Sequence, residues 1–404
     1  MPERNPEPSL DIVRARTIIP LCGELPARGM ASLNAPFAAL DDGVIVARNG
    51  VILAVEPFRD FRRRVAGVEP TALRDLGDAL LAPGFVNCHT HLELSHLAGK
   101  TVGGKGFLPW VQSLVALDGK EKPDEPPAAL DNAVHAMARA GTSAVVDTTG
   151  RRPEAVLAAL GKAGITPRPC LEIIGHDPAV RDMRITQAEH SPAFSLAAHA
   201  LYSTPGETAV AARAWCEAKK RPFSIHLAEH ADEVTFLTTG KGPFAQSLHA
   251  RLVPQDWRAP MRRPVRYAHD LGLLAPGTIA VHCVQCDRDE VALLAASGAA
   301  LCLCPRSNSY IGVGEAPLRH FMQAGALLTL GTDSLASNND LNIWNDSEYF
   351  LQKNLAPPNA LLRMLTVNGA SAAMLSGDVG SLETGKQFCY SVFPRDAADL
   401  FRFA

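Results

Sequence analysis

The chain has 404 residues, of which 47% are apolar and 20% charged, a composition typical of a globular protein and unlike that of a disordered or collagenous chain. The 39 basic and 42 acidic residues leave a formal net charge of −3, so no excess of positive charge is available to bind nucleic acid or an anionic membrane. No apolar run reaches the ~20 residues that span a bilayer, and the polar start MPERNPEPSLDIV does not resemble a secretory signal. We therefore expect a cytoplasmic protein that binds neither nucleic acid nor membranes. Its nine cysteines, an odd number at low density, favour reduced thiols over a disulfide framework.

Both ends of the chain have the pattern of a small β domain. Between residues 12 and 78, short β-type runs are separated by the turn signals Asp42-Gly43 and Asn49-Gly50. A turn followed by a strand is again predicted between residues 380 and 394. We therefore predict a β-sandwich domain formed from both termini, residues 1–80 and 373–404, around a central domain at 81–372.

The central part alternates strand-like and helix-like segments, as an α/β fold does. Apolar runs divided by helices indicate a parallel sheet that is buried on both faces, and eight such units predict a TIM-like (β/α)8 barrel. A doubly wound sheet is the alternative, but no GxGxxG motif follows the first strand to support it. The eight runs are residues 80–91, 142–149, 168–175, 193–200, 222–229, 278–284, 299–305 and 326–333, and the clearest helix-like stretches are residues 130–140, 154–163, 207–220, 289–297 and 317–324.

One connection between these units is unusually long. Residues 243–270 contain Pro254, Pro260, Pro264 and Trp257 and exceed the length of a simple connection. Long loops of this kind often close over active sites, so we predict a lid here.

Potential metal ligands follow the apolar runs. Active sites of such barrels lie at the C-terminal ends of the strands, and five of the eight runs end in histidine or aspartate. His89 and His91, two positions apart on a strand, share a face and can bind one ion, and His226 and Asp333 can complete its coordination. Residues at these strand ends are His89, His91, His199, His226, Glu229, His282 and Asp333.

Nitrogen and oxygen ligands without a thiolate suit one Zn²⁺ per chain, and Fe²⁺ or Mn²⁺ are also compatible. Such an ion lowers the pKa of a bound water from about 15.7 towards about 7, which predicts hydrolytic chemistry. Glu229, three residues after His226, is a candidate proton shuttle. An ordinary helix-start glutamate is the other interpretation of Glu229.

Three segments resemble the amidohydrolase superfamily: Pro83 to Glu93 (PGFVNCHTHLE), His226-Leu-Ala-Glu229, and Leu330-Gly-Thr-Asp333-Ser334. The resemblance extends over nearly the whole chain. The order of HxH, His199, HxxE, His282 and GTDS is similar to the aminohydrolase branch that includes methylthioadenosine/S-adenosylhomocysteine deaminases and the chlorohydrolases of triazine breakdown.

The resemblance implies a role for each matching residue. One metal ion would be bound by His89, His91, His226 and Asp333. Glu229 would protonate a ring nitrogen of the substrate while metal-bound hydroxide attacks the amine-bearing ring carbon. His282 would orient the hydroxide and stabilise developing charge, and Asp333 would pass the water proton to departing ammonia. His199 matches a position that contacts the substrate.

The substrate is less closely defined by these motifs. HTHLELS and Cys304-Pro-Arg306-Ser-Asn308 resemble deaminases of 6-aminodeoxyfutalosine, an adenosine-like precursor in menaquinone biosynthesis that carries a benzoate group. Arg306 could pair with that carboxylate, with Arg151 and Arg152 as rivals, and Glu93 could also bind substrate.

Several alternatives stay open. The segment after HxH is short, basic and glycine-rich, unlike the acidic loop of the methylthioadenosine deaminases, although those enzymes and other purine deaminases remain alternatives. A chlorohydrolase or cyclic amidase would use the same site, and a non-catalytic scaffold would keep only the metal. A small purine nucleoside-like substrate is the expected partner, and a homodimer is compatible with the sequence.

Overall fold

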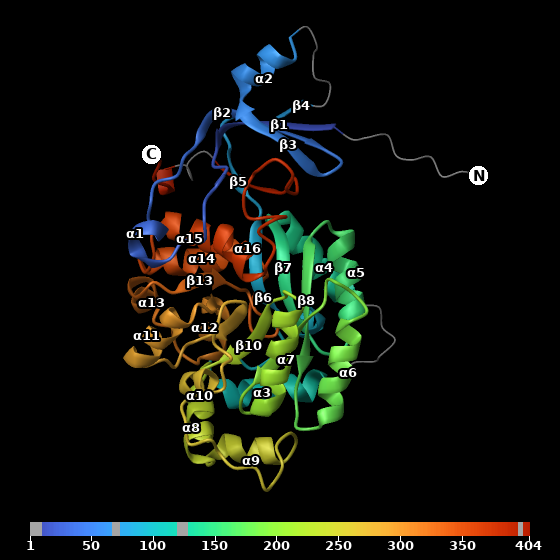
Figure 1. The fold of residues 1–404 in the computed structure, drawn as a ribbon, viewed down its shortest axis with the longest axis vertical. Coiled ribbons are helices and arrows are strands. Elements are labelled where there is room, and N and C mark those ends of the chain that lie inside the picture. The colour runs from blue at the N-terminus through green and yellow to red at the C-terminus, as the bar shows by residue number, and fades with distance from the viewer. Residues whose placement is uncertain (1–9, 67–72, 119–127, 395–398) are drawn as a thin grey trace, which may run out of the picture.

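The computed structural model describes residues 10–66, 73–118, 128–394 and 399–404, and these residues form two β-sheets surrounded by helices. One is a six-stranded mixed sheet, called sheet A here, which lies at one end of the molecule (Figure 1). Its strands are β1 (Leu10–Ile18), β2 (Leu40–Arg48), β3 (Val51–Pro57), β4 (Leu73–Asp75), β5 (Leu80–Pro83) and β14 (Tyr390–Phe393).

Sheet A joins the two ends of the chain, as predicted. β1 and β2 are antiparallel neighbours, and β14 pairs antiparallel with β5 on the other side of β1. The Ser391 hydroxyl donates a hydrogen bond to the Pro83 carbonyl at 2.8 Å, although 308 positions separate the two residues. On one face of the sheet, Phe61 of α2 (Phe58–Arg64) belongs to the same apolar cluster as Val44 of β2.

The second sheet is a nearly closed barrel of eight parallel strands, which confirms the predicted fold. Each strand is hydrogen-bonded to its neighbours in chain order. The backbone N–H of Asp333, just after β13, donates to the carbonyl of His89 on β6 at 3.0 Å and so links the first and last strands. The strands are β6 (Phe85–Thr90), β7 (Thr142–Thr149), β8 (Thr166–Ile173), β9 (Ser195–Ala200), β10 (Phe223–Leu227), β11 (Thr278–His282), β12 (Ala300–Leu303) and β13 (Leu327–Leu330).

The first predicted run contains two strands, because the chain passes from sheet A into the barrel at Gly84. The Gly84 N–H donates to the Cys389 carbonyl at 3.1 Å, and a Cβ at position 84 would lie only 2.5 Å from Cβ of Ser143. A side chain therefore does not fit at this transition. Because β6 leads directly away from sheet A, the C-terminal ends of the parallel strands lie at the opposite end of the barrel.

Helices surround the barrel, and none of those described is long and apolar enough to cross a membrane. All nine cysteines are free, as predicted.

The five predicted helical stretches correspond to α4, α5, α7, α11 and α13. The remaining helices are α1 (Gly29–Leu33), η1 (Leu92–Leu97), α3 (Phe107–Asp118), α4 (Ala128–Arg139), α5 (Pro153–Lys162), α6 (Pro178–Ala188), α7 (Gly206–Ala218), α8 (Ala231–Thr239), α9 (Pro243–His249), α10 (Pro264–Asp270), α11 (Arg288–Ser297), α12 (Pro305–Ile311), α13 (Leu318–Ala324), α14 (Ile343–Gln352), α15 (Pro358–Leu365) and α16 (Val367–Ala372).

Residues 243–270 are not a simple loop, because they include the helices α9 and α10. These helices and α8 lie at the end of the molecule far from sheet A (Figure 1). Phe244 of α9 packs edge-on against His230 with ring centroids 5.0 Å apart, and the ring of His230 also stacks in parallel on that of Phe107 at 3.7 Å. The segment is therefore anchored beside Glu229, and its action as a lid stays a prediction.

One predicted turn is wrong. Asp42-Gly43 lies inside β2, where Asp42 has a φ of 49° and its carboxylate accepts a hydrogen bond from Arg14 at 2.6 Å. The cross-strand ion pair holds this left-handed residue within the strand. Asn49-Gly50 does form the turn between β2 and β3. The domain boundaries at residues 80 and 372 stay predictions.

Candidate active site and metal centre

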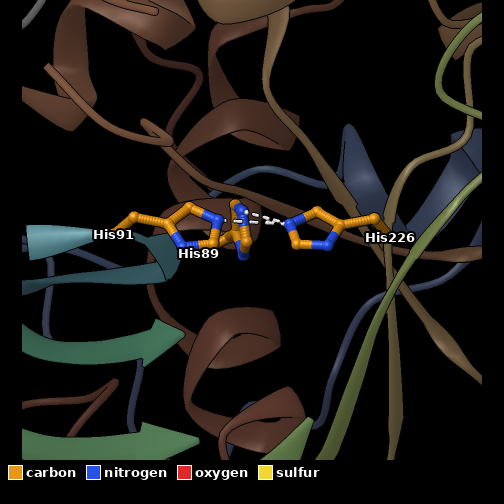
Figure 2. A group of neighbouring side chains, drawn as sticks. All are labelled: His89, His91 and His226. Carbon is orange, nitrogen blue, oxygen red and sulfur yellow. Dashed lines mark hydrogen bonds between the residues drawn. The ribbon is translucent and has the colours of Figure 1, made fainter. Parts of the chain in front are cut away.

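Three histidines from two barrel strands meet at the C-terminal end of the barrel (Figure 2). Nε2 of His226 lies 3.2 Å from Nε2 of His91 and 3.3 Å from Nε2 of His89. Oδ1 of Asp333 lies 3.7 Å from Nε2 of His89 and 3.9 Å from Nε2 of His91. Potential ligand atoms of His89, His91 and His226 lie within 4.8 Å of one another, and so do those of His89, His282 and Asp333.

The geometry of this donor set fits a metal ion. With metal–nitrogen bonds of about 2.0–2.1 Å, two ligands of a tetrahedral site lie about 3.3 Å apart, close to the two nitrogen separations measured here. Nδ1 of His226 is 2.7 Å from the His199 carbonyl, to which it can only donate, so Nε2 of His226 carries a free lone pair in the neutral ring. A cation between the rings would relieve the crowding of these polar atoms, and His89, His91, His226 and Asp333, which would hold it, offer the three nitrogens and one carboxylate oxygen that suit zinc.

The charge states of His89, His226 and Asp333 match those of metal ligands, whereas the pKa of His91 shifts the other way. Burial lowers the pKa of His89 and His226 well below the usual value, which keeps both rings neutral at neutral pH. Burial alone would raise the pKa of Asp333, but the surrounding histidines lower it to about 2, so that it is a carboxylate. The pKa of His91 is raised, because Asp333 and Glu172 outweigh the effect of burial.

Hydrogen bonds hold the Asp333 carboxylate in a fixed orientation. The hydroxyls of Ser307 and Ser337 donate to Oδ2 at 2.6 and 2.9 Å, and the N–H of Ser334 donates to Oδ1 at 2.8 Å. Oδ1 is the oxygen that faces the histidines. Asp333 itself has a φ of 59°, an unusual conformation for a residue with a side chain and one that is frequent at functional sites.

Glu229 and His282 form a second pair beside the metal ligands. Oε1 of Glu229 lies 3.7 Å from Nε2 of His282. Burial and then the nearby charges of Asp333 and Glu233 raise the pKa of Glu229 well above its usual value, which favours the protonated form of this carboxyl group. Burial lowers the pKa of His282, whose Nδ1 lies 2.9 Å from Oδ1 of Asn308. The Glu229 backbone N–H is held in turn by the Glu233 carboxylate at 2.7 Å.

His199 lies on β9 next to this cluster. Its ring centroid is 5.1 Å from that of His226, and its Nδ1 is 2.6 Å from the Ser203 hydroxyl. Burial lowers the pKa of His199 to about 3. A neutral ring with Nε2 left for a ligand is therefore present where the sequence predicts substrate contact.

The other predicted substrate-binding residues have structural partners. The carboxylate of Glu93 accepts hydrogen bonds from the Thr149 hydroxyl at 3.0 Å and from the backbone N–H groups of Gly150 and Arg151 at 2.9 and 2.8 Å. Glu93 thus holds the loop after β7 instead of presenting free oxygens. Arg151 is exposed on that loop, and Arg152 is half-buried.

Arg306 also has a partner within the protein, and its role in substrate binding stays a prediction. Its guanidinium makes two parallel hydrogen bonds to the carboxylate of Asp340, at 2.9 and 2.8 Å. The fork expected to bind a substrate carboxylate is therefore engaged within the protein. Arg306 lines a pocket of about 250 Å³ with Ser309, Tyr310, Asn338, Asn339 and Tyr349.

Three residues of the site, Glu172, Ser307 and Asn308, receive no role from the sequence motifs. Glu172 lies near the end of β8, and one oxygen of its carboxylate lies within 4.8 Å of potential ligand nitrogens of His199 and His226. A charged residue inside an otherwise apolar run is costly to bury, and this signal could have identified it. Ser307 and Asn308 follow Arg306 directly, and no spacing rule distinguishes them from ordinary polar residues of a loop.

Comparison with known proteins identifies the family. Residues 80–402 match the model of the amidohydrolase family. The chain belongs to this family. The predicted resemblance and the predicted enzyme class, a hydrolase of carbon–nitrogen bonds, are thereby confirmed.

Individual relatives of this family member are deaminases by name. A 5-methylthioadenosine/S-adenosylhomocysteine deaminase of Nitratidesulfovibrio vulgaris (strain DSM 19637 / Miyazaki F) is 32% identical over 374 residues, covering 87% of this chain and 79% of the relative. An aminodeoxyfutalosine deaminase of Deinococcus radiodurans is 27% identical over 362 residues, covering 84% of this chain and 82% of the relative.

Solved structures agree with the fold. An adenosine deaminase from Xanthomonas campestris with bound zinc superposes with a TM-score of 0.75 at 25% identity, covering 96% of this chain and 85% of the other. A Helicobacter pylori aminofutalosine deaminase in complex with methylthio-coformycin superposes with a TM-score of 0.80 at 20% identity, covering 96% and 95% of the two chains. The second likeness demonstrates the shared fold.

Proposed function

We propose that this chain is a metal-dependent hydrolytic deaminase of an adenosine-like nucleoside. The observation that carries the proposal is the buried carboxyl group of Glu229, which lies 3.7 Å from the buried His282 beside the proposed metal ligands. A purely structural metal site has no use for a buried carboxyl group placed next to an imidazole. The named relatives support the same class of reaction.

The metal ligands are His89, His91, His226 and Asp333, and one zinc ion per chain is the metal we propose, with Fe²⁺ or Mn²⁺ as alternatives. A divalent ion there lowers the pKa of water towards about 7 and supplies a hydroxide at neutral pH. The zinc named in the Xanthomonas structure supports this choice.

The protein's own groups move the protons. Glu229 donates its proton to a ring nitrogen, which makes the adjacent amine-bearing carbon electrophilic. His282 carries its proton on Nδ1, because Asn308 Oδ1 can only accept, so Nε2 of His282 accepts a hydrogen bond from the attacking water and orients it. Asp333 takes one proton of the attacking water and passes it to the departing ammonia, and the second proton of the water returns to Glu229 as the ring carbonyl forms, which replaces the proton that Glu229 gave to the ring nitrogen. His199 binds the substrate through Nε2.

The substrate we propose first is 6-aminodeoxyfutalosine. Support comes from the CPRSN and HTHLELS motifs, from the Deinococcus relative, and from the Helicobacter structure of the same fold. Three arginines are candidates for reading the benzoate group: Arg306, which pairs with Asp340, and Arg151 and Arg152, which lie on the loop held by Glu93.

A second candidate substrate is methylthioadenosine or S-adenosylhomocysteine. It is favoured by the Nitratidesulfovibrio relative, which at 32% identity is more similar to this chain than the Deinococcus enzyme at 27%. Both candidates contain an adenine ring, so the reaction at the site is the same for both. They differ only in the group attached to the sugar.

Ammonia release tests the proposal. The zinc-loaded chain is incubated with aminodeoxyfutalosine, methylthioadenosine, S-adenosylhomocysteine, adenosine, guanine and a chlorotriazine, and ammonia and chloride are measured. We expect ammonia from adenine nucleosides, with the highest kcat/KM for aminodeoxyfutalosine. Ammonia from no adenine nucleoside would overturn the deaminase proposal, and chloride release alone would assign the site to a chlorohydrolase. A higher kcat/KM for methylthioadenosine would favour the second candidate.

A further inference from the structure

Glu172 is an acidic residue near the cluster to which the proposed reaction assigns no role. It lies two positions after the buried Cys170 on β8, so both side chains lie on the same face of the strand. Its Oε1 is buried, and no described residue forms a hydrogen bond with it. A buried carboxylate oxygen without a donor is costly and indicates a ligand or water that supplies one.

A second metal ion does not explain Glu172. The potential ligand atoms of Glu172, His199 and His226 lie within 4.8 Å of one another. Nε2 of His226, however, already faces His89 and His91, and its Nδ1 donates to the His199 carbonyl. Only Glu172 and Nε2 of His199 would remain for a second ion, which is fewer than the three or four protein ligands of ordinary zinc sites.

The two groups instead form a pair of hydrogen-bond acceptors. The Ser203 hydroxyl donates to the Ala200 carbonyl at 3.2 Å, so it accepts the hydrogen bond from Nδ1–H of His199. That leaves Nε2 of His199 as an acceptor in the neutral ring. One carboxylate oxygen of Glu172 lies within 4.8 Å of a ring nitrogen of His199. Two adjacent acceptors are complementary to two adjacent donors, such as the hydroxyls of a vicinal diol.

The position of the pair around the barrel agrees with this ligand. Glu229 and Asp333 follow β10 and β13, and His282 ends β11, whereas Glu172 and His199 belong to β8 and β9. In the strand order of the barrel, β8 and β9 lie across from β12 and β13. A substrate whose ring reacts between Glu229 and Asp333 therefore extends the rest of its atoms across the mouth towards β8 and β9.

We propose that Glu172, with His199, binds the vicinal hydroxyls of the substrate's sugar and so determines a preference for ribonucleosides over deoxyribonucleosides. This inference rests on the proposed function, because it takes the substrate to be a nucleoside. It adds a specificity-determining residue on β8 to the groups that act on the adenine ring.

The test compares sugars in binding and in turnover. Purine riboside and its 2′-deoxy and 3′-deoxy forms, which lack the amine, are titrated into the zinc-loaded chain by calorimetry, and adenosine and its deoxy forms are assayed for ammonia. For the parent chain we expect each missing hydroxyl to weaken binding by about 10-fold, as the loss of a hydrogen bond to a buried acceptor does. In Glu172→Ala the ribosides should bind no better than the deoxyribosides, with KM raised and kcat little changed.

Two controls accompany the variant. Glu154→Ala removes an exposed carboxylate on the neighbouring helix α5 and should keep the full preference for ribosides. Glu172→Gln keeps the size of the side chain and one acceptor oxygen, so it should retain part of the preference.

The outcomes separate this inference from the proposed function. An unchanged preference in Glu172→Ala, or no preference in the parent chain, overturns the role of Glu172 even when ammonia is released. Absence of ammonia together with a preference that Glu172→Ala removes overturns the reaction but keeps the sugar subsite. Two metal ions per parent chain and one in Glu172→Ala would assign Glu172 to a metal site instead.

Discussion

Oδ1 of Asn308 lies 2.9 Å from Nδ1 of His282 and thereby fixes which nitrogen of His282 faces Glu229. Asn308 and Ser307 lie on the inner face of α12, and they contact His282 and Asp333 respectively. Arg306, Ser309 and Tyr310 of the same helix face the pocket on its other side. The short helix α12 therefore orients two residues of the proposed active site at once.

Replacement of Asn308 should impair turnover through His282. In Asn308→Ala the His282 ring loses its hydrogen-bond partner and can rotate or change tautomer. We therefore expect kcat to fall by about 10- to 100-fold, as when an orienting partner of a site histidine is removed. Asn308→Asp, which still accepts the Nδ1 proton, should recover part of kcat and shift the pH profile upwards. Ser309→Ala, on the exposed face of α12, is the control and should leave kcat unchanged. Equal kcat values for parent and Asn308→Ala would contradict the orienting role.

Glu229 should be needed for turnover but not for metal binding. Glu229→Gln removes the acid that protonates the ring nitrogen, and we expect kcat to fall by about 10²- to 10⁴-fold. The metal content, measured by mass spectrometry of the purified variant, should stay at one ion per chain because Glu229 is not among the four clustered donors. Substantial residual turnover would show that another group supplies the proton, and loss of metal would make Glu229 a ligand.

Removal of the metal should destabilise the fold. Without a cation, the neutral rings of His89 and His226 and the Asp333 carboxylate lose their common partner. A metal present at 100 times its dissociation constant contributes about 2.7 kcal/mol to the free energy of unfolding. We therefore expect dialysis against a chelator to lower Tm and abolish turnover, and added zinc to restore both. His91→Ala should show the lower Tm before dialysis, and an unchanged Tm in the metal-free chain would argue against a tightly bound ion.

The buried Asp346 should give stability a dependence on pH. Burial raises the pKa of this carboxyl group from its usual value of 3.8 to about 8, although Arg306 acts in the opposite direction. Between about pH 4 and pH 8 the folded chain holds a proton that the unfolded chain has released, so the free energy of unfolding contributed by Asp346 falls as the pH rises. Asp346→Asn should remove this contribution.

Urea unfolding at pH 5 and pH 8 measures the effect. The loss of stability between the two pH values should be smaller in Asp346→Asn than in the parent chain. Asp182→Asn, which changes an exposed carboxylate, should behave like the parent. A parent chain with the same pH dependence as Asp346→Asn would mean that Asp346 is ionised in the folded state.

The barrel and its ligand-bearing strand ends could be predicted because both follow local rules. Apolar runs with helices between them indicate parallel strands, and the two-residue period brings His89 and His91 to one face. The position of catalytic groups in barrels is also general, so His226 and Asp333 could be assigned to the same end. The structure adds the separations between them: Nε2 of His89 lies 3.3 Å from Nε2 of His226 and 3.7 Å from Oδ1 of Asp333.

The remaining features depend on contacts between distant residues. Asp340 lies 34 positions from Arg306, and no periodic pattern in the sequence predicts that its carboxylate accepts hydrogen bonds from the Arg306 guanidinium. The left-handed φ angles of His282 and Asp333, 72° and 59°, turn the chain at the strand ends in a way that the alternating pattern does not encode. Helix content within residues 243–270 is obscured by prolines, which here begin α9 and α10 instead of interrupting them.

Sheet A pairs a strand that is synthesised early with a strand that is synthesised near the end of translation. A ribosome synthesises β5 early, but its antiparallel partner β14 emerges only after the whole barrel, with 308 positions between Pro83 and Ser391. β6, which carries His89, continues directly from β5 through Gly84. The anchorage of the first histidine-bearing strand is thus completed last during translation, and contacts of such long range slow folding.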